Sequence, residues 1–292
     1  MEEQGFITTP DGVRLWYRLV GRGAPAVIVP HGLYYADDLA ALWQDRSAVV
    51  YDLRNRGRSD AGAEPARRSR GVLHDLDDLE AVRSHFGLAR VDLVGHSYVA
   101  VIALHYAMTR PERVGRVVAF GPPGYGIGHE APPPPDAVAR DVFRQLGALQ
   151  GAPFADAPAR CRGFWQVLAR LYVVDQGLAP RIAPWGRCDL PNERAFVAYW
   201  TSHVEPSLKQ LPAGASDLAR ATCPVLVVHG RDDRSAPYGA GRAWAARLPD
   251  ARLLTVPHTA HAPWLEAPRA VIPAVQTFLG GAWPDAAEQV PA

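Results

Sequence analysis

Ser97 stands in a sequence context that suits a nucleophile. The residues Gly95-His96-Ser97-Tyr98 come directly after the apolar run Val91 to Val94 and directly before a stretch of helical character. In a G-x-S-x-G elbow, a strained strand-to-helix turn holds the serine with its hydroxyl exposed. The context predicts such a turn at Ser97, with an ordinary capping or turn serine as the alternative.

The second glycine of the elbow motif is absent from this chain. Val99 stands in its place, and its branched side chain is expected to crowd the neighbouring strand where glycine allows a close approach. The small Ala100 beside it relieves part of that crowding.

A serine hydroxyl needs a general base, and the base needs a partner that fixes its tautomer. The sequence offers two carboxylates, Asp232 and Asp233, after one apolar run. Two histidines, His258 and His261, follow the next run. In open α/β sheets the ligand crevice lies outside the carboxyl ends of the strands, so we expect these groups to meet Ser97 there.

Short apolar runs bounded by turn residues predict strands that are buried on both faces. These runs are residues 26–29, 48–51, 91–94, 117–120, 225–228 and 253–256. The turn sequence Pro10-Asp11-Gly12 predicts an opening hairpin. Helical patterns cover residues 76–86, 100–108, 238–248 and 271–279. The alternation predicts an α/β fold with a mostly parallel, doubly wound sheet.

The segment from residue 122 to residue 221 breaks this alternation. It begins with several prolines and continues with helix-like, aromatic-rich stretches that contain no clear buried strand. We expect an inserted helical cap, because a lid that closes over a site excludes water. A helical subdomain that serves only stability is the alternative. Residues 1–121 and 222–292 then form the core, and the tail after Gly281 is expected to be poorly ordered.

The chain resembles the α/β-hydrolase superfamily, in particular the capped serine hydrolases. These include carboxylesterases, lactonases, carbon–carbon bond hydrolases and proline iminopeptidases. Ser97, Asp233 and His261 occur in the family's order of nucleophile, acid and histidine. The family's acid loop selects Asp233 over Asp232, and a following Glu266 selects His261 over His258. Ala260 stands where the family usually has a glycine.

The resemblance also implies roles for two loops. Leu33, in Pro30-His31-Gly32-Leu33, is expected to supply one backbone N–H of an oxyanion hole, and Tyr98 the other. His31 itself is expected to be structural. The turn from Asp52 to Ser59 resembles the family's Asp-x-Arg-x-x-Gly-x-Ser turn and is assigned a structural role. Three side chains are expected to line the substrate cavity: Tyr34, Trp200 and His203.

The composition excludes several kinds of partner. With 31 Lys and Arg against 30 Asp and Glu, the net charge of +1 gives no field to attract nucleic acid or an anionic membrane. No run reaches the roughly 20 apolar residues of a membrane span, and the N-terminal residues do not resemble a secretory signal. We expect a small-molecule substrate, and the sequence does not indicate an oligomeric state.

The cysteines and histidines do not form a metal-binding pattern. Cys161, Cys188 and Cys223 are an odd number at wide spacing, which favours reduced thiols and with them a cytoplasmic location. His258 and His261 stand three residues apart on one loop, which is weak support for a metal site. No phosphate-binding or dinucleotide-binding fingerprint follows a strand. We therefore expect neither a metal nor a cofactor.

Hydrolysis of a carboxylic ester or lactone through an acyl-enzyme on Ser97 is the leading hypothesis for the function. Cleavage of a carbon–carbon bond is the second. A proline iminopeptidase-like activity ranks lower, because the His-Gly-Gly-Pro-Gly loop of that group is absent. A ligand-binding or cyclase-like protein that keeps the fold without hydrolysis is the alternative from another class, since Val99 and Ala260 depart from the family pattern.

Overall fold

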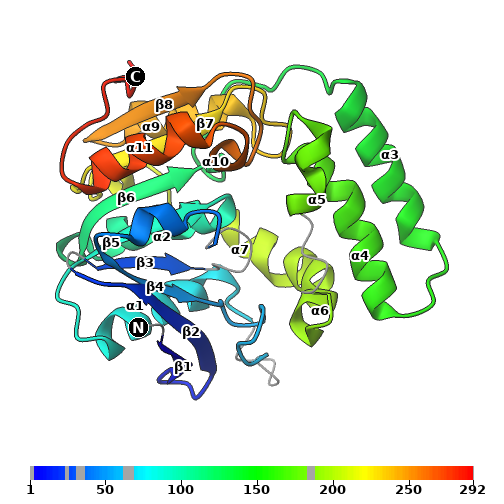
Figure 1. The fold of residues 1–292 in the computed structure, drawn as a ribbon, viewed down its shortest axis with the longest axis horizontal. Helices are drawn as coiled ribbons and strands as arrows, with labels where there is room; N and C mark the ends of the chain where they lie inside the picture. Colours follow the sequence, from blue (N-terminus) through cyan, green and yellow to red (C-terminus); the bar gives the residue numbers. More distant parts are fainter. Residues whose placement is uncertain (1–2, 24–25, 31–36, 62–68, 183–187, 292) are drawn as a thin grey trace.

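An eight-stranded sheet runs through the centre of the computed structural model, which describes residues 3–23, 26–30, 37–61, 69–182 and 188–291 (Figure 1). The strand order is β1-β2-β4-β3-β5-β6-β7-β8. The strands are β1 (Glu3–Thr8), β2 (Arg14–Gly21), β3 (Val27–Pro30), β4 (Ser47–Tyr51), β5 (Val91–His96), β6 (Val114–Phe120), β7 (Val225–Gly230) and β8 (Ala251–Val256).

The sheet is mostly parallel, as the sequence predicts. β1 pairs antiparallel with β2, and β2 pairs antiparallel with β4, whereas the pairs from β4 through β3 to β8 are parallel. The predicted hairpin joins β1 to β2. Gly12 has a φ of 81° in its turn, a conformation that glycine adopts at little cost, and its N–H donates to the Thr9 carbonyl at 2.9 Å.

The parallel strands are buried on both faces, which explains their continuous apolar sequences. In β3, Val27 and Val29 belong to one core cluster, while Ile28 between them belongs to the other. Each is completely buried. Because successive side chains of a strand point to opposite faces, a strand between two helical layers favours apolar residues at successive positions.

Helices cover both faces of this sheet. One layer holds α1 (Val72–His85), α2 (Tyr98–Thr109) and α9 (Tyr238–Arg247), and the other holds η1 (Ala40–Trp43), α10 (Pro263–Glu266) and α11 (Pro268–Leu279). A single-turn 3-10 helix, η3 (Pro111–Arg113), precedes β6. Together with the sheet these layers form the predicted α/β-hydrolase fold.

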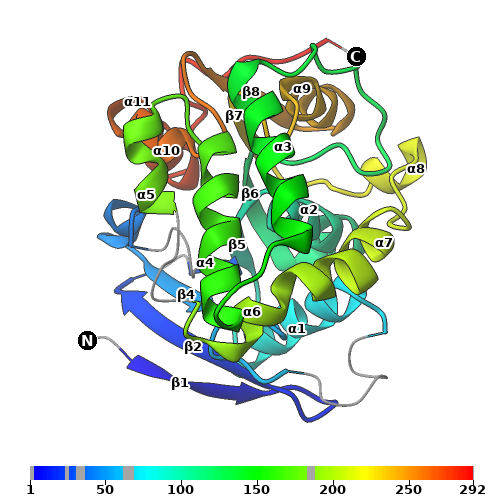
Figure 2. The same ribbon diagram turned by 90° about the vertical axis from the view of Figure 1, so that its right-hand side faces the viewer.

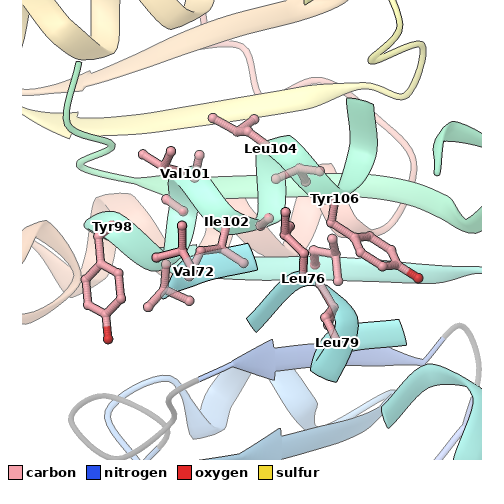
Figure 3. Close-up of a cluster of buried hydrophobic side chains, with 14 of the residues drawn as sticks. Val72, Leu76, Leu79, Tyr98, Val101, Ile102, Leu104 and Tyr106 are labelled. Atoms are coloured by element: carbon pink, nitrogen blue, oxygen red, sulfur yellow. The ribbon is translucent and has the colours of Figure 1, made fainter. Parts of the chain in front are cut away.

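Helix α2 is apolar around nearly its whole circumference, because it is covered on all sides. Figure 3 shows Ile102 on the side of α2 that faces Val72 and Leu76 of α1, and Leu104 on the opposite side. Ile102 and Leu104 are completely buried. Burial of such side chains stabilises the fold by roughly 1.5–3 kcal/mol each, so α2 anchors the turn that precedes it.

The chain between β6 and β7 contains helices and, in its described residues, no strand. They are α3 (Ala137–Gly151), α4 (Ala157–Leu168), η4 (Ala169–Leu171), η5 (Gln176–Leu178), α5 (Ala179–Ile182), α6 (Pro191–Tyr199), the π-helical turn η7 (Trp200–Val204), α7 (Glu205–Leu208) and α8 (Ala215–Leu218). Helices α4, α5 and α6 lie beside the carboxyl ends of the parallel strands, and α3 stacks against α4 (Figures 1 and 2). The cap boundaries at residues 122 and 221 stay a prediction.

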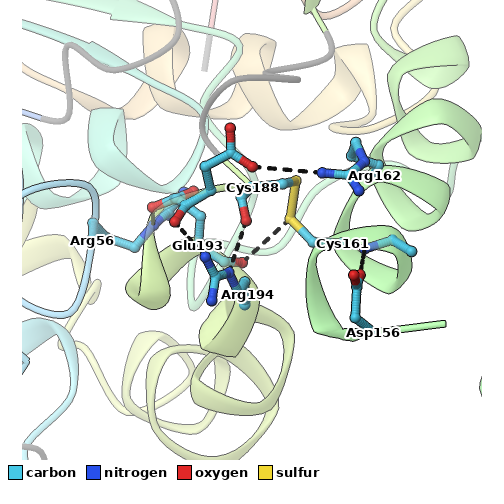
Figure 4. Close-up of a disulfide and its surroundings, with 9 residues drawn as sticks. Arg56, Asp156, Cys161, Arg162, Cys188, Glu193 and Arg194 are labelled. Carbon is cyan, nitrogen blue, oxygen red and sulfur yellow. Dashed lines mark hydrogen bonds and ion pairs between the residues drawn. A yellow bond between two sulfur atoms is a disulfide. The ribbon is translucent and has the colours of Figure 1, made fainter. Parts of the chain in front are cut away.

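Two cysteines are bonded to each other, so the expectation of three reduced thiols is wrong. Cys161 of α4 and Cys188 form a disulfide (Figure 4), whereas Cys223 is a buried free thiol. The 27-residue separation between the paired cysteines does not reveal that α4 passes beside the segment that precedes α6. The expected cytoplasmic location rested on reduced thiols and loses that support. No helix in the described ranges is long and apolar enough to cross a bilayer.

The tail after Gly281 packs on the core, contrary to the expectation of poor order. Trp283 contacts the Phe278 ring with centroids 5.0 Å apart, and the Arg252 guanidinium lies 4.8 Å from the centre of the Trp283 ring. Glu288 pairs with Leu253 of β8 in an isolated antiparallel bridge. A partly buried tryptophan and a backbone bridge therefore fix a segment whose composition alone suggests disorder.

Helix α1 buries an acidic side chain, Asp75, which is 3% exposed. Burial, followed by repulsion from Asp78, raises the pKa of Asp75 to about 8 against the attraction of Arg54 and Arg56. The folded chain thus keeps this proton at pH values where the unfolded chain, with an ordinary value of 3.8, releases it. The free energy of unfolding falls as pH rises through that window.

Asp75→Asn is expected to remove this loss of stability. The Tm advantage of the variant over the wild type should grow between pH 5 and pH 8.5 and reach several degrees at the upper end, because the amide carries no charge to desolvate. Thermal melts across this pH range measure the effect. The control is Asp77→Asn, which removes a half-exposed carboxylate of the same helix and should leave the pH slope unchanged. Parallel pH profiles for wild type and Asp75→Asn would contradict the expectation.

Candidate active site

Ser97 lies at the tip of the turn between β5 and α2. Its backbone has φ 58° and ψ −132°, a strained conformation for a residue with a side chain. The Ser97 N–H donates to the Phe120 carbonyl of β6 at 2.8 Å. Burial of α2 on one side and this hydrogen bond on the other hold the strained turn.

The tight contact of this turn occurs at Gly95. A Cβ at Gly95 would lie 2.8 Å from the Ala100 Cα and 2.8 Å from the Val99 carbonyl oxygen, so any larger residue would push α2 away. The Val99 side chain is completely buried in the core. The close contact with α2 therefore occurs at the first glycine of the motif, and the valine at the second position packs as a core residue.

His261 and Asp233 are hydrogen-bonded to each other. The His261 Nδ1 atom lies 2.7 Å from Asp233 Oδ2, and both side chains are completely buried. The N–H groups of Ser235 and Ala236 donate to the other carboxylate oxygen at 2.7 and 2.8 Å. His229 Nε2 lies 3.3 Å from Oδ2. Burial would raise the pKa of Asp233, but the attraction of His261 and His229 and their hydrogen bonds outweigh burial and lower it.

The second ring nitrogen of His261 is the one left for chemistry. A carboxylate only accepts hydrogen bonds, so Nδ1 carries the proton and Nε2 of the neutral ring presents a lone pair. Nε2 is buried, and among the described residues no group is hydrogen-bonded to it. The Ser97 hydroxyl is therefore not hydrogen-bonded to Nε2 in this structure. The His261 ring lies 4.4 Å, centre to centre, from the ring of His96, the residue that directly precedes Ser97.

Glu266 fixes the loop that carries His261. Its Oε2 accepts the Ala260 N–H at 2.6 Å, and its Oε1 accepts the N–H groups of Val174 and Asp175 at 2.6 and 3.1 Å. A Cβ at Gly230 would lie 2.0 Å from the Ala260 carbonyl oxygen. The close approach of the two loops is thus made by Gly230, and a methyl group at Ala260 is tolerated.

The alternative acid and histidine lie elsewhere. Asp232 and His258 are both exposed to solvent, and His258 has a φ of 55° in its turn. Neither is hydrogen-bonded to His261 or Asp233 among the described residues. Throughout the residues that the structure describes, no group of three or more His, Cys, Asp or Glu side chains is arranged to hold a metal ion.

A cavity of about 270 Å³ opens beside Ser97. Aromatic rings dominate its walls: Tyr125, Phe164, Trp165, Tyr172, Phe196, Trp200 and Trp264. Its polar lining residues are Arg56, His96, Ser97, Tyr98 and Ser235. Such an apolar pocket with few polar groups is typical of sites for small molecules.

The residues predicted to line the cavity differ in their positions. Trp200 lines it. His203 is half-buried and does not belong to the cavity lining; its ring stacks on Tyr199 with centroids 5.4 Å apart. Tyr34, Leu33 and His31 lie outside the described residues. Tyr98 begins α2, so its N–H lies at the positive end of the helix directly after Ser97.

Hydrogen bonds within the turn from Asp52 to Ser59 hold its shape. Asp52 Oδ2 accepts the Arg58 N–H at 2.9 Å, and the Ser59 hydroxyl donates to the Asp52 carbonyl at 2.6 Å. Sequence reasoning missed that one side chain of this turn, Arg56, lines the cavity. In the sequence Arg56 stands between two turn residues, and this position does not indicate a place in the cavity wall. Trp264, three residues after His261, was also missed, although its spacing from the histidine offered a signal.

A strained serine turn, a buried histidine–carboxylate pair and an adjacent apolar cavity at the ends of parallel strands define an α/β-type hydrolase. The comparison with protein families agrees. Residues 25–268 match the family model described as alpha/beta hydrolase fold, and the chain belongs to this family.

Named relatives are hydrolases of different substrates. The chain is 28% identical over 252 residues to "Putative carbamate hydrolase RutD" of Pseudomonas savastanoi pv. phaseolicola, covering 82% of this chain and 87% of that protein. It is 25% identical to a 2-hydroxy-6-oxononadienedioate/2-hydroxy-6-oxononatrienedioate hydrolase of Cupriavidus pinatubonensis, covering 94% of each chain. The structure of a 2-hydroxy-6-oxo-6-phenylhexa-2,4-dienoate hydrolase from a Rhodococcus species is similar, with a TM-score of 0.75, 19% identity and coverage of 96% and 100%.

Gly121→Ala is expected to disturb the histidine–carboxylate pair. Gly121 has a φ of 51°, and a Cβ there would lie 3.0 Å from His261 Nδ1 and 3.3 Å from Asp233 Oδ2. The left-handed backbone alone costs an alanine about 1–2 kcal/mol. Thermal melting should therefore show a lower Tm, and proton NMR should show a shifted or lost signal for the Nδ1–H that binds Asp233.

The matched control is Gly147→Ala in α3, where a Cβ meets nothing within 4 Å. Alanine is favoured over glycine inside a helix by roughly 0.5–1 kcal/mol, so this variant should melt no lower than the wild type and keep the Nδ1–H signal. Equal behaviour of the two variants would show that the pair does not depend on space at Gly121.

Proposed function

We propose that the chain is a serine hydrolase that cleaves a small carboxylic ester or lactone through an acyl-enzyme on Ser97. The observation that carries this proposal is the 2.7 Å hydrogen bond between His261 Nδ1 and Asp233. It leaves Nε2 as the only basic atom of the ring, in a buried position next to the residue that precedes Ser97.

The proposed reaction has two steps. The Ser97 oxygen bonds to the acyl carbon as its proton passes to His261 Nε2, and the leaving alcohol departs with that proton. Water then attacks the ester of Ser97, assisted by the same nitrogen, and releases the acid. Asp233 stays ionised and stabilises the imidazolium. The backbone N–H groups of Tyr98 and Leu33 are expected to bind the oxyanion, where each donor typically contributes about 10²–10³ in rate.

We further propose that residues 122–221 act as a cap. Phe164, Trp165 and Trp200 come from the helices between β6 and β7 and line the cavity. Walls of this kind favour an apolar substrate and keep bulk water out of the closed site.

Carbon–carbon bond hydrolysis is a second candidate. The relative from Cupriavidus pinatubonensis, which matches nearly the whole chain, is named as a hydrolase of 2-hydroxy-6-oxononadienedioate, and this name favours the reaction. A carbamate is a further candidate substrate, because another relative is named as a putative carbamate hydrolase. Attack on a carbonyl and a basic histidine serve each of these reactions.

Covalent labelling tests the nucleophile. A fluorophosphonate probe should add to wild-type protein, and mass spectrometry should place the adduct on Ser97. The Ser97→Ala variant should show no adduct, because the alkoxide equivalent is gone, while its Tm stays within a few degrees of the wild type. Labelling that persists in Ser97→Ala, or none in a folded wild type, would remove this mechanism.

A substrate panel separates the candidates. We expect the largest kcat/KM for p-nitrophenyl esters or lactones, a lower value for a 2-hydroxy-6-oxodienoate and negligible turnover of amino-acid amides. The order is measured with purified protein at one pH. A preference for the dienoate would favour the carbon–carbon hydrolase. Failure to turn over any of them, combined with a raised Tm in the presence of an apolar ligand, would favour a binding or cyclase-like role.

A further inference from the structure

The cavity wall contains a buried ion pair that the proposed mechanism does not use. Arg56 Nε and Nη2 donate to the two carboxylate oxygens of Glu193, each at 2.9 Å. The side chains are 2% and 0% exposed. Arg56 follows β4 in the core, and Glu193 belongs to α6, so the pair joins the two parts of the chain that enclose the cavity (Figure 4).

Further contacts hold both partners in place. Glu193 Oε1 also accepts the Gly57 N–H at 2.9 Å. Arg56 Nη1 donates to the Tyr98 hydroxyl at 3.0 Å, and its guanidinium lies 3.5 Å from the centre of the Phe196 ring. Glu193 thus engages the forked side of the guanidinium, which is the side that matches a carboxylate.

Arg56 is the one permanently charged side chain among the described residues that line the cavity. A guanidinium in an apolar pocket would be a strong site for a substrate carboxylate if it faced the pocket without a counter-ion. Here the counter-ion is built into α6. A substrate carboxylate at this end of the cavity would bring a second negative charge against a single cation at low dielectric.

We propose that Glu193 determines the charge selectivity of the site: by pairing with Arg56 it restricts the cavity to substrates that are uncharged at the Arg56 end. This inference rests on the proposed serine hydrolase function and specifies its substrate class. A buried pair of this kind costs desolvation that an apolar pair would avoid, which is consistent with a role in selection rather than in stability.

An acidic group of the described chain also faces this pair. Asp75 of α1 interacts with Arg56 and with Tyr98, and it can ionise to replace a lost carboxylate. Asp78 is bound to Arg54 instead. A test of Glu193 must therefore include a variant in which Asp75 cannot compensate.

The experiment compares two esters that differ only at the far end of the acyl chain. The p-nitrophenyl ester of hexanoate ends in a methyl group, and the mono-p-nitrophenyl ester of adipate ends in a carboxylate. For the wild type we expect kcat/KM to be at least about 100-fold larger for the hexanoate ester than for the adipate ester. In Glu193→Gln this preference should fall at least about tenfold, mainly through a lower KM for the adipate ester. Asp75→Asn/Glu193→Gln should show a shift at least as large.

The control is Asp189→Asn, which removes a carboxylate that is 71% exposed and lies four residues before Glu193. Its substrate preference should equal that of the wild type. The inference is overturned if the wild type hydrolyses both esters equally well. It is also overturned if Glu193→Gln and the double variant melt cooperatively, react with the fluorophosphonate and keep the wild-type preference. If Glu193→Gln does not fold, Glu193→Asp should move the preference in the same direction by a smaller factor.

Binding measurements separate this inference from the proposed function. Hexanamide ends in a methyl group and adipamate ends in a carboxylate, as the two esters do. Their binding can be measured without turnover. If no ester is hydrolysed, the hydrolase proposal fails, yet a rise in Tm with hexanamide and none with adipamate would still support charge selection by Glu193. Equal shifts with both ligands would overturn it.

Discussion

The hydrogen bond between His261 and Asp233 depends on the register of two neighbouring strands. Gly230 at the end of β7 pairs with Val256 at the end of β8, so the loops that follow leave the sheet side by side. A residue larger than glycine at position 230 would collide with the Ala260 carbonyl. The contact between these loops brings a carboxylate and an imidazole together where both side chains are buried. Electrostatic attraction between two such groups is stronger there than in water, because the dielectric constant is lower.

A second buried charge, that of Arg56 in the cavity wall, is neutralised in a similar way. Asp233 is surrounded by backbone N–H groups and two histidines, and Arg56 is bound by Glu193 and Tyr98. Each buried charge therefore has its partners supplied by the protein. The space between them is left to aromatic side chains, which have large apolar faces and lose little conformational freedom on burial.

The sheet, its flanking helices and the loops that carry Ser97, Asp233 and His261 were predictable, because burial on two faces and position at strand ends both leave a local pattern. The pairing of Arg56 with Glu193 was not, since the two residues are 137 positions apart and lie in a turn and a helix with unrelated patterns. The same holds for Cys161 and Cys188, whose bond depends on how α4 passes the segment before α6. His203 was misplaced because helical spacing does not say which face of a helix meets a cavity.

The last residues of the chain have a consequence for the edge of the sheet. β8 is the outermost strand on its side, and the bridge between Leu253 and Glu288 occupies backbone groups that an outer strand would otherwise present to solvent. Exposed edges of this kind pair readily with strands of other molecules. The tail therefore disfavours self-association through this edge. A chain shortened before Glu288 would leave these backbone groups of β8 available for pairing with another molecule.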